Sequence, residues 1–422
     1  MERGEEIRQH LFSLSSRGIK YDLDRMLSAV EACGNPQKAY PCFHVAGTNG
    51  KGSVCSYLES CLRRCGFKTG LFTSPHLVCF EERFMINGAP VNESLWLTVY
   101  RDVQTEIDRF RLTFFEASTL IAFEIFRREK IGWAVFETGL GGRFDATNVV
   151  VPAVSVITRV AMDHMEYLGG DLASIAGEKL GIAKRGVPLV MFEPESAVIK
   201  AFAVKHCEKT GASCRFVNKA EAAGCVVDAD GASFRFDGRN YRINLPGEFQ
   251  VANALLALAA LKAAGTSGMP AAALARGFAD ARLPGRFQTL FVRNRLTVFD
   301  VGHNPDAASA LCRSLRERFK KQSICLVLGI MKDKDMAGMM EHYVTVARRI
   351  ICTAPATERA AAPETLKNMV PGTFNGGLSA VSTVAAAVEE AFESKEDIVC
   401  IAGSFFTVGE AMEYLNLDPY KQ

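Results

Sequence analysis

The chain has 422 residues, of which 48% are hydrophobic and 23% charged, so it has the material for sizeable cores and the length for two domains. Its 49 basic and 47 acidic side chains nearly balance, which gives no electrostatic reason to expect nucleic acid or a membrane surface as a partner. We find no uncharged apolar stretch long enough to span a bilayer and no signal-peptide pattern at the start. Thirteen cysteines lie mostly in apolar runs without paired metal-binding spacing, so we expect a reduced, cytoplasmic protein.

Short apolar runs alternate with longer helical patterns along the first part of the chain. Residues 42–46 predict a buried strand that enters a glycine-rich turn, and apolar residues in 54–65 then recur with helical spacing. Further strand-like runs follow at 133–136, 154–157 and 188–192, with helical stretches between them. This alternation is typical of a mostly parallel sheet covered by helices.

A different pattern occupies residues near 213–245, where two alternating runs flank Asp237-Gly238 and predict a β-hairpin. The α/β alternation then restarts, with strand-like runs at 296–300, 324–328, 349–353 and 398–402. We therefore expect an α/β fold of two domains. Residues 1–288 form the first, with a mostly parallel sheet, and residues 289–422 form a smaller, Rossmann-like C-terminal domain.

A glycine-rich loop, Ala-Gly-Thr-Asn-Gly-Lys-Gly-Ser at 46–53, lies between the first predicted strand and helix. Its backbone N–H groups can surround an anion, and Lys51 can reach the β- and γ-phosphates of a nucleotide, which makes the first domain a P-loop ATPase domain. Gly52 separates the lysine from the serine, so the strict GxxxxGK[ST] pattern of ordinary GTPases and motor ATPases is not met. The alternative is a glycine-rich turn with an exposed lysine. The candidate ATP-binding residues of the loop are Asn49, Gly50, Lys51, Gly52 and Ser53.

Other polar residues have both a functional and a structural interpretation. Glu137 ends the run at 133–136, so its carboxylate lies at the carboxyl edge of the sheet, where α/β sites collect; an exposed strand-end charge is the alternative. His164 by itself is more typical of a hydrogen-bonded loop histidine, and Lys179 of a solvated helix lysine. The paired Phe114 and Phe115 are by themselves more typical of a core.

Several blocks, in order along nearly the whole chain, resemble the folylpolyglutamate synthase/dihydrofolate synthase branch of the Mur ligase superfamily. The phosphate loop resembles that of the superfamily, and Thr-Ser-Pro-His-Leu at 73–77 narrows the resemblance to this branch. The remaining blocks are at 137–148, 162–164, 178–182, 284–288, 300–305 and 403–404.

The resemblance implies an ATP-dependent ligase that joins L-glutamate to a carboxylate of dihydropteroate or of a folate. The reaction would pass through an acyl phosphate and release ADP and phosphate. ATP would be a co-substrate, two Mg²⁺ ions would assist, and the chain would act as a monomer. Whether the enzyme is a dihydrofolate synthase, a folylpolyglutamate synthase or both is left open by the sequence.

The family also implies roles for individual residues. Ser74 and Glu137 would bind one Mg²⁺ and His164 a second, while Lys179 matches a lysine that is carbamylated in the family. Lys51, His164 and Lys179 are thus the catalytic candidates. On the nucleotide, Asn253 would contact adenine, Arg286 the phosphates and Asp300 the ribose, with His303 in the same segment as a further ATP-binding candidate. The candidate pterin-binding residues are Thr113, Phe114, Phe115, Glu116, Phe144, Asp145 and Ala146.

Two other functions remain as alternatives. A Mur-type UDP-muramoyl peptide ligase would share the loop and the modified lysine, but residues 73–77 and the expected lack of an N-terminal nucleotide-sugar domain argue against it. A non-catalytic P-loop switch of the GTPase kind should carry an N-K-x-D motif, whereas residues 218–221 read Asn-Lys-Ala-Glu.

Overall fold

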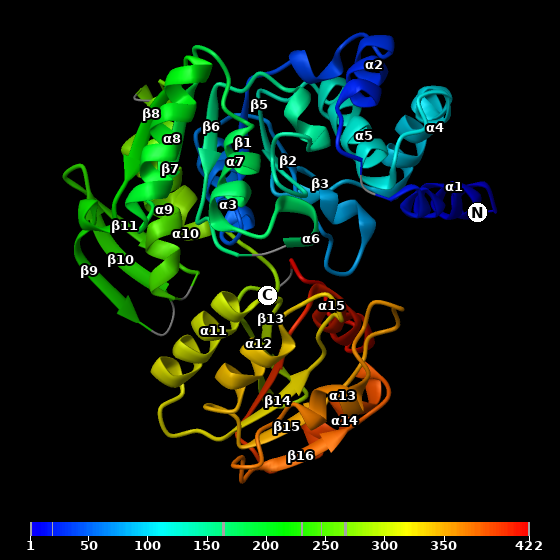
Figure 1. Ribbon diagram of the computed structural model, residues 1–422, viewed down its shortest axis with the longest axis vertical. Helices are drawn as coiled ribbons and strands as arrows, with labels where there is room; N and C mark the ends of the chain where they lie inside the picture. The colour runs from blue at the N-terminus through cyan, green and yellow to red at the C-terminus, as the bar shows by residue number, and fades with distance from the viewer. Residues whose placement is uncertain are drawn as a thin grey trace.

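The computed structural model describes residues 2–18, 20–162, 165–228, 231–245, 247–265 and 268–420. They form two α/β domains, with the N-terminal domain above the C-terminal domain in Figure 1. Within the described residues, no helix combines the length and the apolar character that crossing a membrane requires.

The N-terminal domain is built on an eight-stranded sheet of order β4-β3-β2-β5-β1-β6-β7-β8. The six strands from β2 to β8 in this order are parallel, and β3 and β4 are antiparallel additions at one edge. This result confirms the mostly parallel sheet. The strands are β1 Cys42–Ala46, β2 Thr69–Phe72, β3 Phe84–Ile86, β4 Ala89–Pro90, β5 Trp133–Glu137, β6 Val154–Ile157, β7 Pro188–Phe192 and β8 Ser213–Val217.

Helices cover both faces of this sheet (Figure 1). Alternate residues of each strand point to opposite faces, so Phe43 packs in one core with α3, α9 and α10, while Phe136 packs in another with α4 and α5. Both faces are therefore apolar, as expected for a parallel sheet. The helices are α1 Glu2–Ser13, α2 Asp24–Ala32, α3 Lys51–Arg64, α4 Glu93–Arg109, α5 Phe114–Arg128, α6 Met165–Leu168, α7 Leu172–Leu180, α8 Ala197–Thr210, α9 Glu248–Ala263 and α10 Ala271–Asp280.

A small antiparallel sheet of order β11-β10-β9 follows the large one. Its strands are β9 Ala223–Asp228, β10 Gly231–Phe236 and β11 Arg239–Ile243. The hairpin between β10 and β11 confirms the prediction, and its two turn residues, Asp237 and Gly238, have φ values of 50° and 76°. The predicted hairpin region near 213–245 is wrong at its start, because residues 213–217 form β8 and pair in parallel with β7.

The C-terminal domain contains a six-stranded sheet of order β12-β13-β17-β14-β15-β16, in which only the edge strand β12 is antiparallel. Its strands are β12 Gln288–Val292, β13 Arg295–Asp300, β14 Ile324–Leu328, β15 Arg349–Cys352, β16 Gly377–Ala380 and β17 Ile398–Ala402. Its helices are α11 Pro305–Arg318, α12 Met336–Tyr343, α13 Pro363–Asn368, α14 Val384–Glu393 and α15 Phe405–Tyr414. The domain boundary at 288–289 stays a prediction; it falls at the first residues of β12.

The central strand β1 carries a buried histidine, His44. His44 is 0% exposed, and burial, assisted by the nearby Lys184 charge, lowers the pKa of its imidazole to about 3. Its Nε2 lies 2.7 Å from Oγ1 of Thr147, and Nδ1 has no hydrogen-bond partner among the described residues. The folded state thus holds this imidazole neutral.

We expect the free energy of unfolding to fall as the pH drops from about 6.5 towards 3, because only the unfolded chain then protonates His44. The contribution of one such group is about 1.4 kcal/mol per pH unit. Urea unfolding followed by tryptophan fluorescence reports on this domain, since both tryptophans, Trp96 and Trp133, lie in it. His44→Gln should flatten the pH dependence of stability in this window, and an unchanged slope would contradict the prediction.

Candidate active site

The phosphate loop runs from the end of β1 to the start of α3, and its backbone requires glycine at two positions. Gly47 and Gly50 have φ values of 151° and 91°, in the region that side chains disfavour. A Cβ on Gly47 would lie 1.8 Å from Oγ1 of Thr158, and one on Gly50 would lie 2.5 Å from Oδ1 of Asn253. The loop is therefore held closely between β6 and α9.

Two lysines of the predicted catalytic set contact carbonyl oxygens of this loop. Nζ of Lys51 donates to the carbonyls of Gly47 at 3.0 Å and Thr48 at 3.2 Å, so the amine lies over its own loop. Nζ of Lys179, on α7, donates to the carbonyl of Gly47 at 3.0 Å, and this side chain is 3% exposed. Lys179 is therefore a buried residue of the site rather than a solvated helix lysine.

Glu137 lies at the carboxyl end of β5, beside the phosphate loop. It is 6% exposed, and burial raises the pKa of its carboxyl. The cations of Lys51 and Arg286 lower this pKa, but by less than burial raises it. The backbone N–H of Ser74 donates to it, and a Cβ on Gly52 would lie 3.9 Å from its Oε2. The structure thus brings Ser74 and Glu137 together next to the loop.

This pair of residues fits a Mg²⁺ ion. A desolvated carboxylate gains from a cation, and a carboxylate with a hydroxyl gives the hard oxygen ligands that Mg²⁺ takes along with phosphates and water. His164, the predicted ligand of the second Mg²⁺, lies outside the described residues. Among the residues that are described, no group of three or more His, Cys, Asp or Glu side chains is placed to hold a metal.

Arg286 connects the two domains electrostatically. Its cation lowers the pKa values of two buried carboxyls, Glu137 on the N-terminal side and Asp300 at the end of β13, although burial raises both pKa values overall. The guanidinium carbon lies 5.3 Å from the ring centre of Phe405, at the start of α15. Arg286 thus lies between the phosphate loop region and the C-terminal sheet.

The carboxylate of Asp300 is fixed by backbone donors. Oδ2 accepts from the N–H of Phe287 at 2.9 Å and Oδ1 from the N–H of Gly302 at 2.8 Å. His303 follows closely: its Nδ1 lies 3.1 Å from the carbonyl of Val301, and its ring centre lies 6.0 Å from that of Phe405. Phe405 was missed by sequence reasoning, although it directly follows the block at 403–404.

The side chain of Asn253, the predicted adenine contact, packs against Gly50 of the phosphate loop. Its Nδ2 donates to Oε1 of Gln250 at 3.1 Å, one turn earlier on α9, and Gln250 is 1% exposed. Ser53, in the first turn of α3, is buried at 4% exposure. These residues therefore form the packing around the loop.

The predicted pterin-binding residues divide into two structural groups. Thr113 and Glu116 form a capping box at the start of α5: Oε2 of Glu116 accepts from the N–H of Thr113 at 2.8 Å, and Oγ1 of Thr113 accepts from the N–H of Glu116. Glu116 also pairs with Arg25 of α2 at 3.1 Å. Both side chains thus have a structural role in starting the helix.

The two phenylalanines of this segment are partly buried and face different neighbours. The Phe114 ring stacks on Phe12 of α1, with ring centres 5.4 Å apart and 22° between planes, and the guanidinium of Arg83 lies over it at 5.1 Å. The Phe115 ring lies against Gly139, where an added Cβ would be 2.6 Å from it. Phe12 is 40% exposed and was missed, because one aromatic residue on a terminal helix carries no distinctive sequence signal.

The second group follows β5. Both oxygens of Asp145 accept backbone hydrogen bonds, from Gly139 at 2.8 Å, Leu140 at 2.9 Å and Thr147 at 3.0 Å, and burial raises the pKa of this carboxyl. Phe144 is 39% exposed, whereas Ala146 is 4% exposed. Asp145 therefore fixes the loop that presents Phe144.

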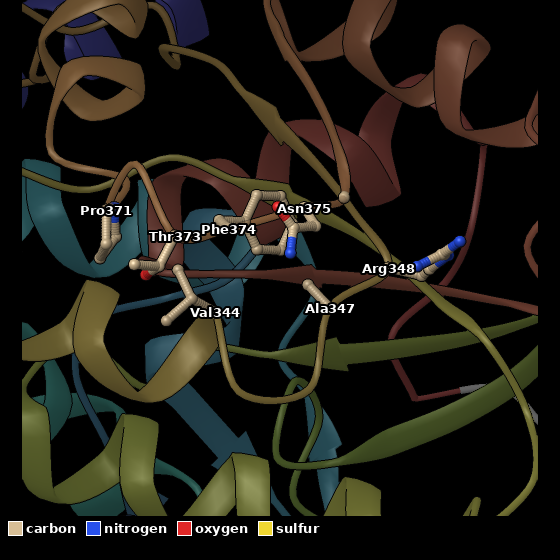
Figure 2. A pocket seen from close by; sticks show the side chains of 8 residues that line it. Val344, Ala347, Arg348, Pro371, Thr373, Phe374 and Asn375 are labelled. Carbon is tan, nitrogen blue, oxygen red and sulfur yellow. The ribbon is translucent and has the colours of Figure 1, made fainter.

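A cavity of about 260 Å³ lies elsewhere, in the C-terminal domain. Figure 2 shows Arg348, Phe374 and Asn375 among the residues that line it, in the loops before β15 and β16. Those strands lie at the end of the domain that points away from the N-terminal domain (Figure 1). This cavity includes no residue of the predicted site.

Comparison with known proteins assigns the family. Residues 45–261 match the Mur ligase middle domain, and residues 285–405 match the glutamate ligase domain of Mur ligases. The dihydrofolate synthase/folylpolyglutamate synthase of Escherichia coli (strain K12) is 35% identical over 413 residues, which cover 96% of this chain and 94% of the relative. The chain belongs to the dihydrofolate synthase/folylpolyglutamate synthase family.

Solved structures of this family have the same fold. The E. coli FolC in complex with DHPP and ADP has a TM-score of 0.87 and 33% identity, covering 97% of both chains. A bifunctional folylpolyglutamate synthase/dihydrofolate synthase with Mn, AMPPNP and L-glutamate bound has a TM-score of 0.85 and 30% identity, covering 97% of this chain and 98% of that one. The predicted fold class, of a P-loop ATPase domain with a smaller C-terminal α/β domain, is thereby confirmed.

Proposed function

We propose that this protein is an ATP-dependent carbon–nitrogen ligase that joins L-glutamate to a carboxylate of dihydropteroate and of (tetrahydro)folate, releasing ADP and phosphate. The observation that carries this proposal is the junction between the domains, where Arg286 acts on the buried Glu137 beside the phosphate loop. The family relationship supports it, since related structures contain ADP with DHPP, or AMPPNP with Mn and L-glutamate. The Mur-type peptide ligase and the nucleotide switch lack comparable support.

In the first step, a carboxylate oxygen of the pterin substrate attacks the γ-phosphorus of ATP. The bond to the β,γ-bridging oxygen breaks, ADP leaves and an acyl phosphate forms. Lys51 and the amides of the phosphate loop stabilise the charge on the γ-phosphate oxygens, and Arg286 approaches from the C-terminal side. The amine of Lys51 donates to two loop carbonyls in this structure, and it exchanges these hydrogen bonds for phosphate oxygens when ATP binds.

In the second step, the amine nitrogen of L-glutamate attacks the acyl carbon. The tetrahedral intermediate breaks its bond to the phosphate oxygen, and the departing phosphate takes up the proton lost from nitrogen. No protein nucleophile is needed, because the phosphate is the leaving group. The protein contributes by orienting the reactants and by neutralising charge.

We assign the metal and nucleotide residues as follows. Ser74 and Glu137 hold one Mg²⁺ and His164 a second, and such ions neutralise phosphate charge when bound. Asn253 contacts adenine, Asp300 with His303 binds the ribose side, and Lys179 is carbamylated. The pterin lies against Phe114, Phe115 and Phe144, whose partial exposure supports stacking on a flat ring.

The experiment that tests the proposal uses the purified full-length chain with ATP, Mg²⁺ and L-glutamate. Dihydropteroate, tetrahydrofolate and no pterin are compared, with ADP release measured and products weighed by mass spectrometry. A mass gain of one glutamyl residue on either pterin supports the ligase and shows which activity it has. ADP release that is indifferent to both pterins, without an amide product, would overturn the proposal.

Phe12 offers a test of the pterin side. Because its exposed ring stacks on Phe114, Phe12→Ala should raise the KM for the pterin by about threefold to tenfold, as expected for one aromatic contact, and leave the KM for ATP unchanged. Phe67→Ala is the matched control, since Phe67 is 38% exposed and packs edge-on against Trp133, at the start of β5. Equal pterin KM values in the Phe12 variant and the wild type would contradict this role.

We also propose a cytoplasmic location and a monomeric state. All thirteen cysteines are free thiols, which suits a reducing compartment. Fractionation of the native host and light scattering of the purified protein test these two points.

A further inference from the structure

Four side chains, which we call the loop clasp, join the phosphate loop to the first turn of α11: Asn49, Arg159, Asn304 and Asp306. Nδ2 of Asn49 donates to Oδ2 of Asp306 at 2.8 Å, and Nδ2 of Asn304 donates to Oδ1 of Asn49 at 3.1 Å. The other carboxylate oxygen of Asp306, Oδ1, lies 3.2 Å from Nη1 of Arg159. One carboxylate of the C-terminal domain therefore contacts two segments of the N-terminal domain.

On the N-terminal side, Arg159 and the phosphate loop are bonded to each other through the backbone. The N–H of Thr48 donates to the carbonyl of Arg159 at 2.8 Å, and Asn49 forms a β-bridge with Arg159. Oγ1 of Thr158 donates to the carbonyl of Asn49 at 2.8 Å. A contact from Asp306 to either Asn49 or Arg159 thus fixes the same piece of backbone, at Thr48 and Asn49 of the phosphate loop.

On the C-terminal side, the clasp is continuous with the candidate nucleotide residues. Asn304 is 4% exposed, and its Oδ1 accepts from the N–H of Ala307, so it caps α11. Asp300, the proposed ribose ligand, lies six residues before Asp306 in the same short segment. Figure 1 shows α11 in the part of the C-terminal domain that faces the N-terminal domain. The two halves of the proposed ATP site are linked here.

We propose that Asp306 is a positioning residue for ATP, which holds the phosphate loop in register with the C-terminal domain through Asn49 and Arg159. This inference rests on the proposed function. The clasp holds the phosphate loop and the C-terminal domain in place before the nucleotide binds. Without the clasp, ATP binding must also order these two parts, which makes the free energy of ATP binding less favourable. Once ATP is bound, its own contacts hold the halves together, so the chemical step changes little.

The test measures the affinity of the full-length protein for AMPPNP with Mg²⁺ by isothermal titration calorimetry. Loss of a hydrogen bond to a charged group typically changes binding about tenfold, so Asp306→Ala should weaken AMPPNP binding and raise the KM for ATP by about that factor, with kcat within about twofold. Asp306→Asn keeps an oxygen for Asn49 but loses the charge that faces Arg159. Its affinity should therefore lie between those of Asp306→Ala and the wild type.

Glu364→Gln is the matched control, because Glu364 also follows a proline at the start of a C-terminal helix, α13, but pairs with Lys367. It should bind AMPPNP like the wild type. Equal affinities of wild type and Asp306→Ala, or equal weakening in Glu364→Gln, would overturn the inference alone. A wild-type protein that does not bind AMPPNP would overturn the proposed function as well, so the two failures are distinguishable.

Discussion

Glu137→Gln is expected to lower kcat/KM by about a hundredfold to a thousandfold, as is typical when one electrostatic element of an active site is removed. The carboxylate is 6% exposed, and burial raises its pKa, which means that the folded protein holds this charge at a cost when no cation compensates it. Glutamine has the same shape without the charge. The variant should therefore lose activity but remain at least as stable as the wild type.

The sign of the stability effect follows from the direction of the pKa shift. When the pKa of a carboxyl is higher in the folded state than in the unfolded state, its charge lowers the free energy of unfolding at pH values above the unfolded-state pKa. Removing the charge should therefore raise the free energy of unfolding at neutral pH and leave it unchanged in acid. Thermal unfolding without Mg²⁺, together with steady-state kinetics over a range of Mg²⁺ concentrations, tests both effects. An active variant with the wild-type dependence on Mg²⁺ would contradict the assigned role.

Glu124 is the matched control for this variant. It is 3% exposed, and although burial acts to raise its pKa, hydrogen bonds and charges from Arg127 and Arg128 hold that pKa below its usual value. Glu124→Gln should thus lower stability at neutral pH, with the difference shrinking in acid, while activity is kept. Replacement of Glu137 is thus expected to lower activity but not stability, and replacement of Glu124 to lower stability but not activity.

The sequence predicted best the elements that are buried on both faces. Residues 42–46, 188–192, 324–328 and 398–402 were predicted as strands and form β1, β7, β14 and β17 with those bounds, because continuous apolar runs carry a strong signal. Strands such as β2 and β16 were not predicted. Each has only four residues and includes a glycine, so its pairing is decided by neighbouring strands rather than by its own pattern.

Candidate site residues could be proposed from the sequence where polar residues end strands or lie in a glycine-rich turn. Glu137 was proposed in this way, since parallel strands bring their carboxyl ends to one edge, whereas Asp300, which ends β13, was proposed from the family resemblance. Phe12 and Asp306 could not be proposed from the sequence, because the roles that we propose for them depend on contacts with Phe114 and Asn49, which are far away in the chain. Local pattern gives no information on such pairings.

Lys179 is the second residue whose replacement should have a large effect. Its side chain is 3% exposed, and a carbamate forms when the neutral form of a lysine amine reacts with CO₂. The amine nitrogen bonds to the carbon of CO₂ and releases one proton, and the product is a carbamate anion. If this anion supports the second metal, Lys179→Arg should lower kcat by about a hundredfold or more, because a guanidinium stays protonated and forms no carbamate.

A purely structural role predicts a different result. Nζ of Lys179 donates to the carbonyl of Gly47 at 3.0 Å, a contact that needs only a donor. The discriminating measurement is therefore made on the wild type: activity in CO₂-depleted buffer, then after addition of bicarbonate, with the intact mass followed under native conditions. Reversible loss of activity together with loss of one CO₂ mass is the expected outcome. Activity that is indifferent to CO₂, with an unmodified intact mass, would assign Lys179 to holding the loop alone.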